Sequence, residues 1–396
     1  MKNSGDLGVF LPSNFAIDLR QLAALPSSLA RMGALALFDG DQPLHPKARE
    51  VLLAAFDSGW ADPVRRTRDA AKARALLAGA KESLASGLNL RSDEIFLVGE
   101  VSLASTLVLE GALASRGGSL VTSSVERSEI LAVAASRPNS VTIPVDHAGR
   151  IDLAELSNAL EGKIGAICLQ AANGEVGTLQ PLDRASDIAS KHRIPLHIDL
   201  GVGAGRLQLP EYWSYASADA RTWSGPTGLG LYAIRTGARW QYPWATTREQ
   251  REIGSYSIPL VLAAAAALEA WQDDEKLEAG RSRDFVAQIR LAASAVADVE
   301  VVGDPIDRVP NIVTFSALYC DGESLVEEFA LGGFCVGSGS ACTSDQLQPS
   351  HVLAAMGSLT HGNVRVVLPH FTTSEEVDRF CNLIPVAIAN VRRRLL

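Results

Sequence analysis

Residues 196–235 read LHIDLGVGAGRLQLPEYWSYASADARTWSGPTGLGLYAIR, and this stretch decides the fold. It begins with a short apolar run that ends in an acid, Asp199, which predicts a buried strand with a carboxylate at its end. It closes with a turn rich in glycine and proline that leads into a second apolar run. A buried strand that ends in a carboxylate beside a glycine turn is a typical ligand site of α/β folds. We therefore expect an α/β protein with its site at this point.

The composition indicates a soluble globular protein with a sizeable core. The 396 residues are 47% hydrophobic and 20% charged, enough for two domains or for one large α/β domain with an appendage. The net charge is −9 and the only basic run is 392–394. No nucleic-acid partner is expected, because phosphate binding needs a concentrated basic face. No membrane span is expected either, because the most apolar run, 258–271, is too short.

The cysteines predict a reducing compartment. Their number, five, is odd, and no two of them have CxxC spacing. The first residues lack a basic stretch followed by an apolar one, so no signal peptide is expected and the predicted location is cytoplasmic. No set of metal ligands is expected. The cysteines are Cys168, Cys320, Cys335, Cys342 and Cys381.

Three segments are expected along the chain. They are an N-terminal arm over 1–33, a large α/β domain over 34–265 and a small C-terminal domain over 266–396. In the large domain, short apolar runs alternate with helical patterns, which is typical of a mostly parallel sheet. An apolar helix over 260–271 and a charged helix over 273–296 are predicted as separate elements, and the second of them opens the small domain.

Motifs on both sides of the opening stretch resemble the cysteine desulfurases, in the class V aminotransferase group of pyridoxal-phosphate (PLP) enzymes. Residues 170–181, QAANGEVGTLQP, are similar to the family's Asn-Asn-Glu-x-Gly-Thr-x-Gln loop. Residues 335–344, CVGSGSACTS, contain the Ser-Gly-Ser-Ala-Cys-Thr-Ser run of desulfurases that serve iron–sulfur assembly. The resemblance covers about 34–396. It implies the PLP-dependent transferase fold type I, with a mostly parallel seven-stranded sheet flanked by helices and a smaller α+β C-terminal domain.

The Schiff-base lysine of the resembled family is missing. That family has Ser-x-His-Lys before a Gly-Pro pair, and the aligned run here, 219–222, is Asp-Ala-Arg-Thr. Thr222 therefore takes the place of the lysine. A hydroxyl cannot form an imine, which needs a primary amine. Two family positions are kept: Asp199, whose counterpart contacts the pyridine nitrogen, and Ser257, which stands where a Thr reaches the phosphate of the neighbouring subunit.

Other cofactor contacts of the family also change. Arg127 replaces the His that stacks on the pyridine ring, although a guanidinium can also stack on a flat ring. Arg221 and Asp219 are expected to form an ion pair in the vacated phosphate pocket. The sequence therefore predicts no cofactor. Asp199 is either a remnant of the cofactor site or a structural acid paired with Arg127, Arg206 or Arg221. The vestigial cofactor-binding positions are Asp199, Ser257, Thr222, Arg127 and Arg221.

Three further residues have roles that the resemblance implies. Cys342 takes the place of the cysteine that accepts sulfur. Its thiol is either an idle remnant or a persulfide acceptor in a flexible loop. Arg365 corresponds to the arginine that binds the substrate carboxylate as a bidentate fork, and Asn173 is the second candidate for substrate binding.

Three functions are compatible with these residues. The favoured one is a cysteine desulfurase-like protein that does not carry out PLP Schiff-base chemistry. Its role would be binding, regulation or sulfur relay through Cys342, in sulfur or iron–sulfur metabolism. The alternatives are a genuine PLP-dependent cysteine desulfurase or lyase with atypical cofactor binding, and different chemistry on an anionic ligand. The resemblance implies a homodimer. A heterodimer with an active desulfurase, or a complex with a sulfur-acceptor protein, stays open.

Overall fold

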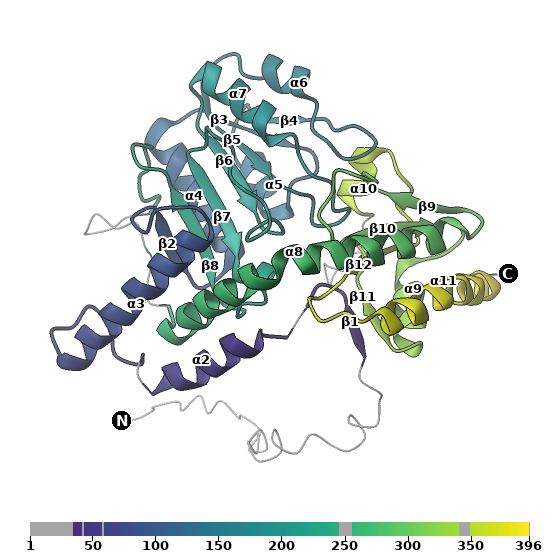
Figure 1. Cartoon of the computed structure of the whole chain (residues 1–396). Coiled ribbons are helices and arrows are strands. Elements are labelled where there is room, and N and C mark those ends of the chain that lie inside the picture. The colour runs from purple at the N-terminus through teal and green to yellow at the C-terminus, as the bar shows by residue number, and fades with distance from the viewer. Residues whose placement is uncertain (1–34, 42, 58, 245–255, 340–348, 396) are drawn as a thin grey trace, which may run out of the picture.

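A seven-stranded sheet forms the centre of the molecule, and helices cover both of its faces (Figure 1). The computed structural model describes residues 35–41, 43–57, 59–244, 256–339 and 349–395. The predicted N-terminal arm lies outside these residues. Among the described residues, no helix combines the length and the apolar character that crossing a membrane requires.

The central sheet has the strand order β2-β8-β7-β6-β5-β3-β4. Strand β8 runs antiparallel to its two neighbours, and the other pairings are parallel. The prediction of a mostly parallel seven-stranded sheet is therefore confirmed. The strands are β2 (Ile95–Val98), β3 (Ser119–Ser123), β4 (Val141–Ile143), β5 (Ile164–Gln170), β6 (Leu196–Leu200), β7 (Tyr215–Asp219) and β8 (Gly230–Ile234).

Both faces of this sheet are buried, because successive side chains of a strand point to opposite sides. On β5, Ile167 and Leu169 join the core under one set of helices, while Ala166 and Cys168 join the core under the other. The first set is α3 (Arg68–Gly87), α6 (Leu153–Asn158), α7 (Leu182–His192) and α8 (Ile258–Ser294). The second set is α4 (Val101–Arg116) and α5 (Ser128–Ala135).

Helix α8 is continuous over Ile258–Ser294, so the prediction of two separate helices is wrong. The sequence changes from apolar to charged near 272, but no proline or glycine interrupts the helical backbone there. The change in composition marks the point where α8 passes from one hydrophobic core to another. The first half of α8 packs in the main core with α3 and with α2 (Pro46–Phe56), and the second half joins the smaller core. The predicted domain boundary at 265/266, which falls inside this helix, stays a prediction.

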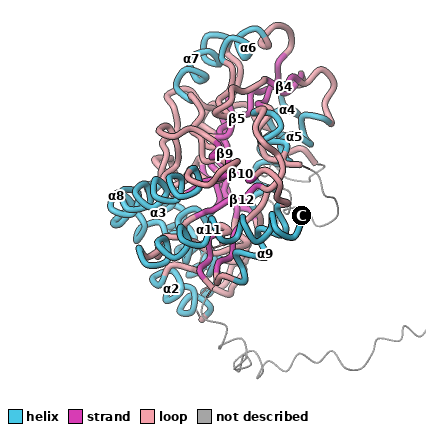
Figure 2. Tube along the Cα trace, turned by 90° about the vertical axis from the view of Figure 1, so that its right-hand side faces the viewer, coloured by secondary structure: helices cyan, strands magenta, loops and turns pink. Residues whose placement is uncertain are grey.

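The rest of the chain forms a smaller body at the end of the molecule where the C-terminus lies (Figures 1 and 2). Strands β12, β10 and β9 pair antiparallel in that order. Strand β1 pairs parallel with β11, so the first described strand belongs to this body. These elements are β1 (Ala36–Phe38), β9 (Val299–Val302), β10 (Ile312–Ala317), α9 (Gly322–Leu331), β11 (Phe334–Val336), α10 (His351–Met356), β12 (Asn363–Val367) and α11 (Ser374–Leu395).

Candidate functional site

Two adjoining cavities open at the carboxyl ends of the parallel strands. Their volumes are about 630 and 230 Å³. Strand β5 ends at Gln170 and β7 at Asp219, and both residues line the larger cavity. Open α/β sheets bind their ligands at this edge. Six of the described residues line both cavities: Gly174, Gly201, Val202, Asp219, Arg221 and Arg365.

Asp199 is a buried acid paired with Arg127. Arg127 Nε donates to Asp199 Oδ2 at 2.6 Å, and the exposed fractions of the two side chains are 27% and 1%. The other carboxylate oxygen accepts from the Gly201 amide at 2.9 Å and from the Ser217 hydroxyl at 3.3 Å. Of the three arginines considered from the sequence, the structure therefore selects Arg127.

A buried hydrogen-bond network holds the Arg127 guanidinium in this position. Its Nη2 donates to Ser105 Oγ at 2.6 Å, and Ser105 Oγ donates to Ser217 Oγ at 2.9 Å. His197 Nε2 lies 3.1 Å from Ser217 Oγ, and its Nδ1 lies 3.0 Å from Cys168 Sγ. Burial lowers the pKa of His197 to about 4, so the ring is neutral at neutral pH. Sequence reasoning missed this network, because its members are far apart in the chain.

Thr222 lies in the 3-10 helix η1 (Ala220–Trp223), directly after β7. Its hydroxyl donates to the backbone oxygen of Asp219 at 2.8 Å, and the residue lines the smaller cavity. The predicted ion pair between Arg221 and Asp219 is confirmed, with Arg221 Nε donating to Asp219 Oδ2 at 2.8 Å.

A glutamate side chain caps the N-terminus of α4. Glu100 is the N-cap, and its Oε2 accepts from the Leu103 amide at 2.8 Å. Burial acts to raise the pKa of Glu100, but hydrogen bonds from the Ser102 and Leu103 amides outweigh it and lower that pKa. A helix N-terminus attracts anions because its amides are free and its dipole is positive. Here the Glu100 carboxylate already takes one of the places that a bound anion would occupy.

Arg365 and Glu175 keep unused hydrogen-bonding groups beside the larger cavity, which both of them line. Arg365 Nη2 donates to the backbone oxygen of Asp39 at 3.0 Å, whereas its buried Nε has no partner among the described residues. Glu175 Oε2 accepts from Ser350 Oγ at 2.8 Å, and its buried Oε1 likewise has no partner there. Sequence reasoning missed Glu175 as a site residue, although it stands inside the quoted loop motif at 170–181. The two groups offer one positive and one negative contact to a ligand.

Asn173 lines the larger cavity, but its amide is largely engaged within the chain. Its Oδ1 accepts from the Glu175 and Val176 amides at 2.9 Å each, and its Nδ2 donates to the Val125 oxygen at 3.0 Å. One N–H is left for a ligand. Its role in substrate binding stays a prediction.

Two predicted site residues are not brought into the cavities by the described part of the chain. Ser257 is the N-cap residue of α8, and neither cavity is lined by it. Cys342 belongs to 340–348, outside the described residues. Its role stays a prediction.

Glu126 is a second buried acid of the site, and sequence reasoning missed it. Both of its carboxylate oxygens lie within reach of the Gln170 amide, at 3.1 and 3.0 Å. Its backbone oxygen lies 2.9 Å from His351 Nε2 on α10. This contact ties the smaller body to the central sheet beside the cavity.

The acid form of Glu126 is expected to make stability depend on pH. Burial raises the pKa of Glu126 from 4.5 to about 8, although the hydrogen bond from Gln170 acts the other way. The folded state holds the Glu126 proton more tightly than the unfolded state does. The stability that this protonated group provides is therefore fully present below the unfolded pKa and is lost as pH rises through the folded pKa. The stability advantage of the wild type over Glu126→Gln should fall by about 3 kcal/mol between about pH 5 and about pH 8. Urea denaturation of both proteins checks this, and a constant difference would contradict it.

Comparison with known proteins gives one consistent result. The family model described as aminotransferase class-V matches residues 49–380. A protein named cysteine desulfurase from Cereibacter sphaeroides is 30% identical over 366 residues, which cover 88% of this chain and 94% of that protein. A protein named cysteine desulfurase IscS from Dictyoglomus turgidum is 27% identical over 369 residues, covering 88% and 93%.

Solved structures share the fold. A NifS-like protein superposes with a TM-score of 0.81 at 21% identity, covering 90% of this chain and 100% of that one. A structure described as SspA in complex with cysteine superposes with a TM-score of 0.72 at 20% identity, covering 85% and 100%. At these identities the likeness concerns the fold, and it agrees with the predicted fold type.

These matches correct the prediction that no cofactor is used. Class-V aminotransferases and cysteine desulfurases normally use PLP, so the expectation of none was wrong. The prediction rested on the missing lysine together with the changed contacts to the ring and the phosphate. The amine is needed for the covalent bond, whereas binding also depends on other contacts.

The described residues nevertheless do not fit covalent attachment of PLP. Residue 222 carries a hydroxyl, and no described lysine lines either cavity. Asp199 already bonds to Arg127, and Glu100 places a negative charge at the helix N-terminus. A phosphate at that terminus would be repelled by Glu100. The described residues that line the two cavities therefore include no lysine amine for an imine.

Proposed function

The chain belongs to the class-V aminotransferase family, and we propose that it is a cysteine desulfurase-like protein that forms no Schiff base through its own side chains. It binds a small amino acid such as cysteine in the cavity. Its role is binding, regulation or sulfur relay, in which Cys342 accepts persulfide sulfur from another protein. A homodimer, or a heterodimer with an active desulfurase, would fit this role.

One observation carries the proposal: the residue at the lysine position, in the 3-10 helix that follows β7, is Thr222, and its hydroxyl donates to the backbone oxygen of Asp219. An imine requires a primary amine, and the lysines nearest in sequence, Lys191 and Lys276, line neither cavity. The comparisons support the family.

Arg365 and Glu175 support a zwitterionic ligand. A guanidinium with a free Nε can bind a carboxylate through a charge-assisted hydrogen bond. A carboxylate with a free oxygen can accept from an ammonium group. Binding would give partners to two buried polar atoms that have none among the described residues, and unsatisfied buried groups cost about 1 to 3 kcal/mol each.

The test combines calorimetry with an activity assay. The full chain is titrated with L-cysteine, with and without added PLP, and sulfide release and the visible aldimine band are followed. Saturable cysteine binding is expected without an aldimine band or sulfide turnover. Arg365→Ala should weaken binding about tenfold, as expected for loss of a charge-assisted contact. The matched control Arg184→Ala, an exposed arginine outside both cavities, should not.

The relay is tested by adding an active desulfurase to the same mixture. Mass spectrometry should then find a persulfide on Cys342 of the wild type and none at that position in Cys342→Ser. An aldimine band with sulfide release by the chain alone would contradict the proposal and favour the second candidate, a PLP-dependent desulfurase. The family membership is the observation that favours that candidate.

A further inference from the structure

Another cavity lies at the opposite edge of the central sheet. It encloses about 620 Å³ beside the starts of β6 and β7, whereas the candidate site lies where these strands end. None of its lining residues lines the two cavities of the candidate site. Its wall includes four arginines: Arg116, Arg193, Arg235 and Arg239.

These arginines come from separate elements that the fold brings together. Arg116 is the last residue of α4, Arg193 directly follows α7, and Arg235 and Arg239 follow β8. The helix dipole favours a basic residue at the end of each helix, which accounts for the first two. It does not account for the last two, nor for the convergence of all four on one cavity.

Hydrogen bonds hold both arginines that follow β8, Arg235 through its guanidinium and Arg239 through its backbone oxygen. Arg235 Nη1 donates to the backbone oxygens of Glu211 and Trp213 at 2.6 and 3.4 Å. Its guanidinium also lies 5.5 Å from the centre of the Trp213 ring. The Arg239 backbone oxygen accepts from Ser115 Oγ on α4 at 3.0 Å. This part of the cavity wall is therefore preorganised.

The cavity is a local basic site on an acidic chain. The net charge of the chain is −9, yet among the described residues two carboxylates, Asp187 and Glu211, line this cavity with the four arginines. Within the described residues, no salt bridge pairs any of the four guanidiniums with a carboxylate. A guanidinium matches phosphate oxygens as a planar fork of donors.

We propose that this cavity binds a small phosphate-bearing anion, such as diphosphate or a nucleoside diphosphate. Its volume lies within the range of about 300 to 1,000 Å³ that is usual for small-molecule sites. A hollow of this size suits a compact polyanion better than an extended acidic polypeptide. The site is independent of the sulfur chemistry proposed above.

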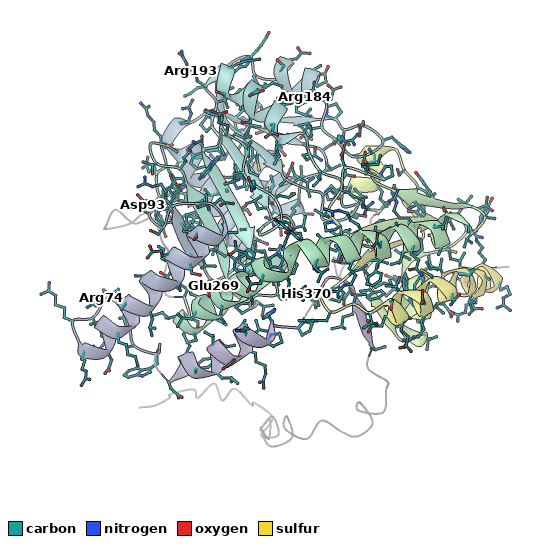
Figure 3. All side chains as sticks on the ribbon, viewed as in Figure 1. Arg74, Asp93, Arg184, Arg193, Glu269 and His370 are labelled. Carbon is teal, nitrogen blue, oxygen red and sulfur yellow. The ribbon has the colours of Figure 1, made fainter. Side chains whose placement is uncertain are left out.

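The test is calorimetric titration of the full chain with inorganic pyrophosphate and, separately, with ADP. Saturable binding is expected at low ionic strength. The variant Arg193→Ala/Arg239→Ala should weaken it about tenfold. The control Arg68→Ala/Arg184→Ala removes the same charge from exposed positions outside the cavity and should bind as the wild type does (Figure 3 labels Arg193 and Arg184). Arg68 begins α3, and Arg184 lies on α7.

The outcomes separate the sources of the anion. Tighter binding of ADP than of pyrophosphate assigns a nucleotide, and binding of pyrophosphate alone assigns a bare diphosphate. The proposal is overturned if neither probe binds, or if the two double variants bind equally, since the charge would then act without this cavity. Tighter binding of a short polyglutamate peptide than of both probes would overturn it in favour of an acidic protein partner.

Discussion

Replacing Arg127 by alanine is expected to lower the free energy of unfolding by about 3 kcal/mol. The substitution leaves the Asp199 carboxylate, 1% exposed, with two uncharged donors from the described part of the chain, the Gly201 amide and the Ser217 hydroxyl. Removing one partner of a buried ion pair costs about 3 to 5 kcal/mol, because the other charge stays buried. The lower end applies here, since the Arg127 side chain is 27% exposed and water partly screens the pair. Chemical denaturation measures the loss.

A double variant separates the two causes of this loss, the unpaired charge of Asp199 and the lost packing of the Arg127 side chain. In Arg127→Ala/Asp199→Asn, residue 199 keeps its shape but carries no charge, so at least half of the lost stability should return. Asp199→Asn alone should cost less than Arg127→Ala, because the arginine left behind can reach water. A single variant Arg127→Ala within about 0.5 kcal/mol of the wild type, the usual range of surface substitutions, would disprove the buried pair.

The pairing of Asp199 could not be predicted from the sequence, although the acid itself could. A carboxylate at the end of an apolar run marks the end of a buried strand, and the structure places it there. Its partner depends on which loops meet at the edge of the sheet. Arg127 follows β3, two strands away from β6, and Arg206 lies nearer in sequence yet bonds elsewhere. Separation along the sequence therefore does not indicate which arginine pairs with Asp199.

The fold was more accessible, because parallel strands buried on both faces are continuous apolar runs. The run 164–170, IGAICLQ, is one example, and all its residues are buried. The predicted break in α8 failed for a related reason. Composition reports what surrounds a segment, and the surroundings of α8 change along its length while its backbone continues. Helix ends are decided by caps and breakers, which are absent near 272.

Arg206→Ala is expected to cause the largest loss of stability, about 4 kcal/mol. Arg206 and Glu278 form a two-point pair, with Nη1 and Nη2 at 2.7 and 3.3 Å from the two carboxylate oxygens. Both side chains are buried, with exposed fractions of 6% and 1%, so water screens neither charge. The guanidinium also lies 4.3 Å from the centre of the Trp271 ring, and this contact is lost as well.

This pair connects the candidate site to α8, so its loss is expected to change binding as well as stability. Arg206 lies in the turn after β6 and lines the smaller cavity, while Glu278 lies on α8. The control Arg206→Met/Glu278→Leu replaces the pair by apolar groups of similar size. It should recover most of the stability, because a buried pair is often no more stable than a well-packed apolar one. If Arg206 also orients the turn, cysteine binding will stay weaker in this control than in the wild type. Equal destabilisation of the single and double variants would show that packing on Trp271, and not the buried charge of Glu278, dominates the loss.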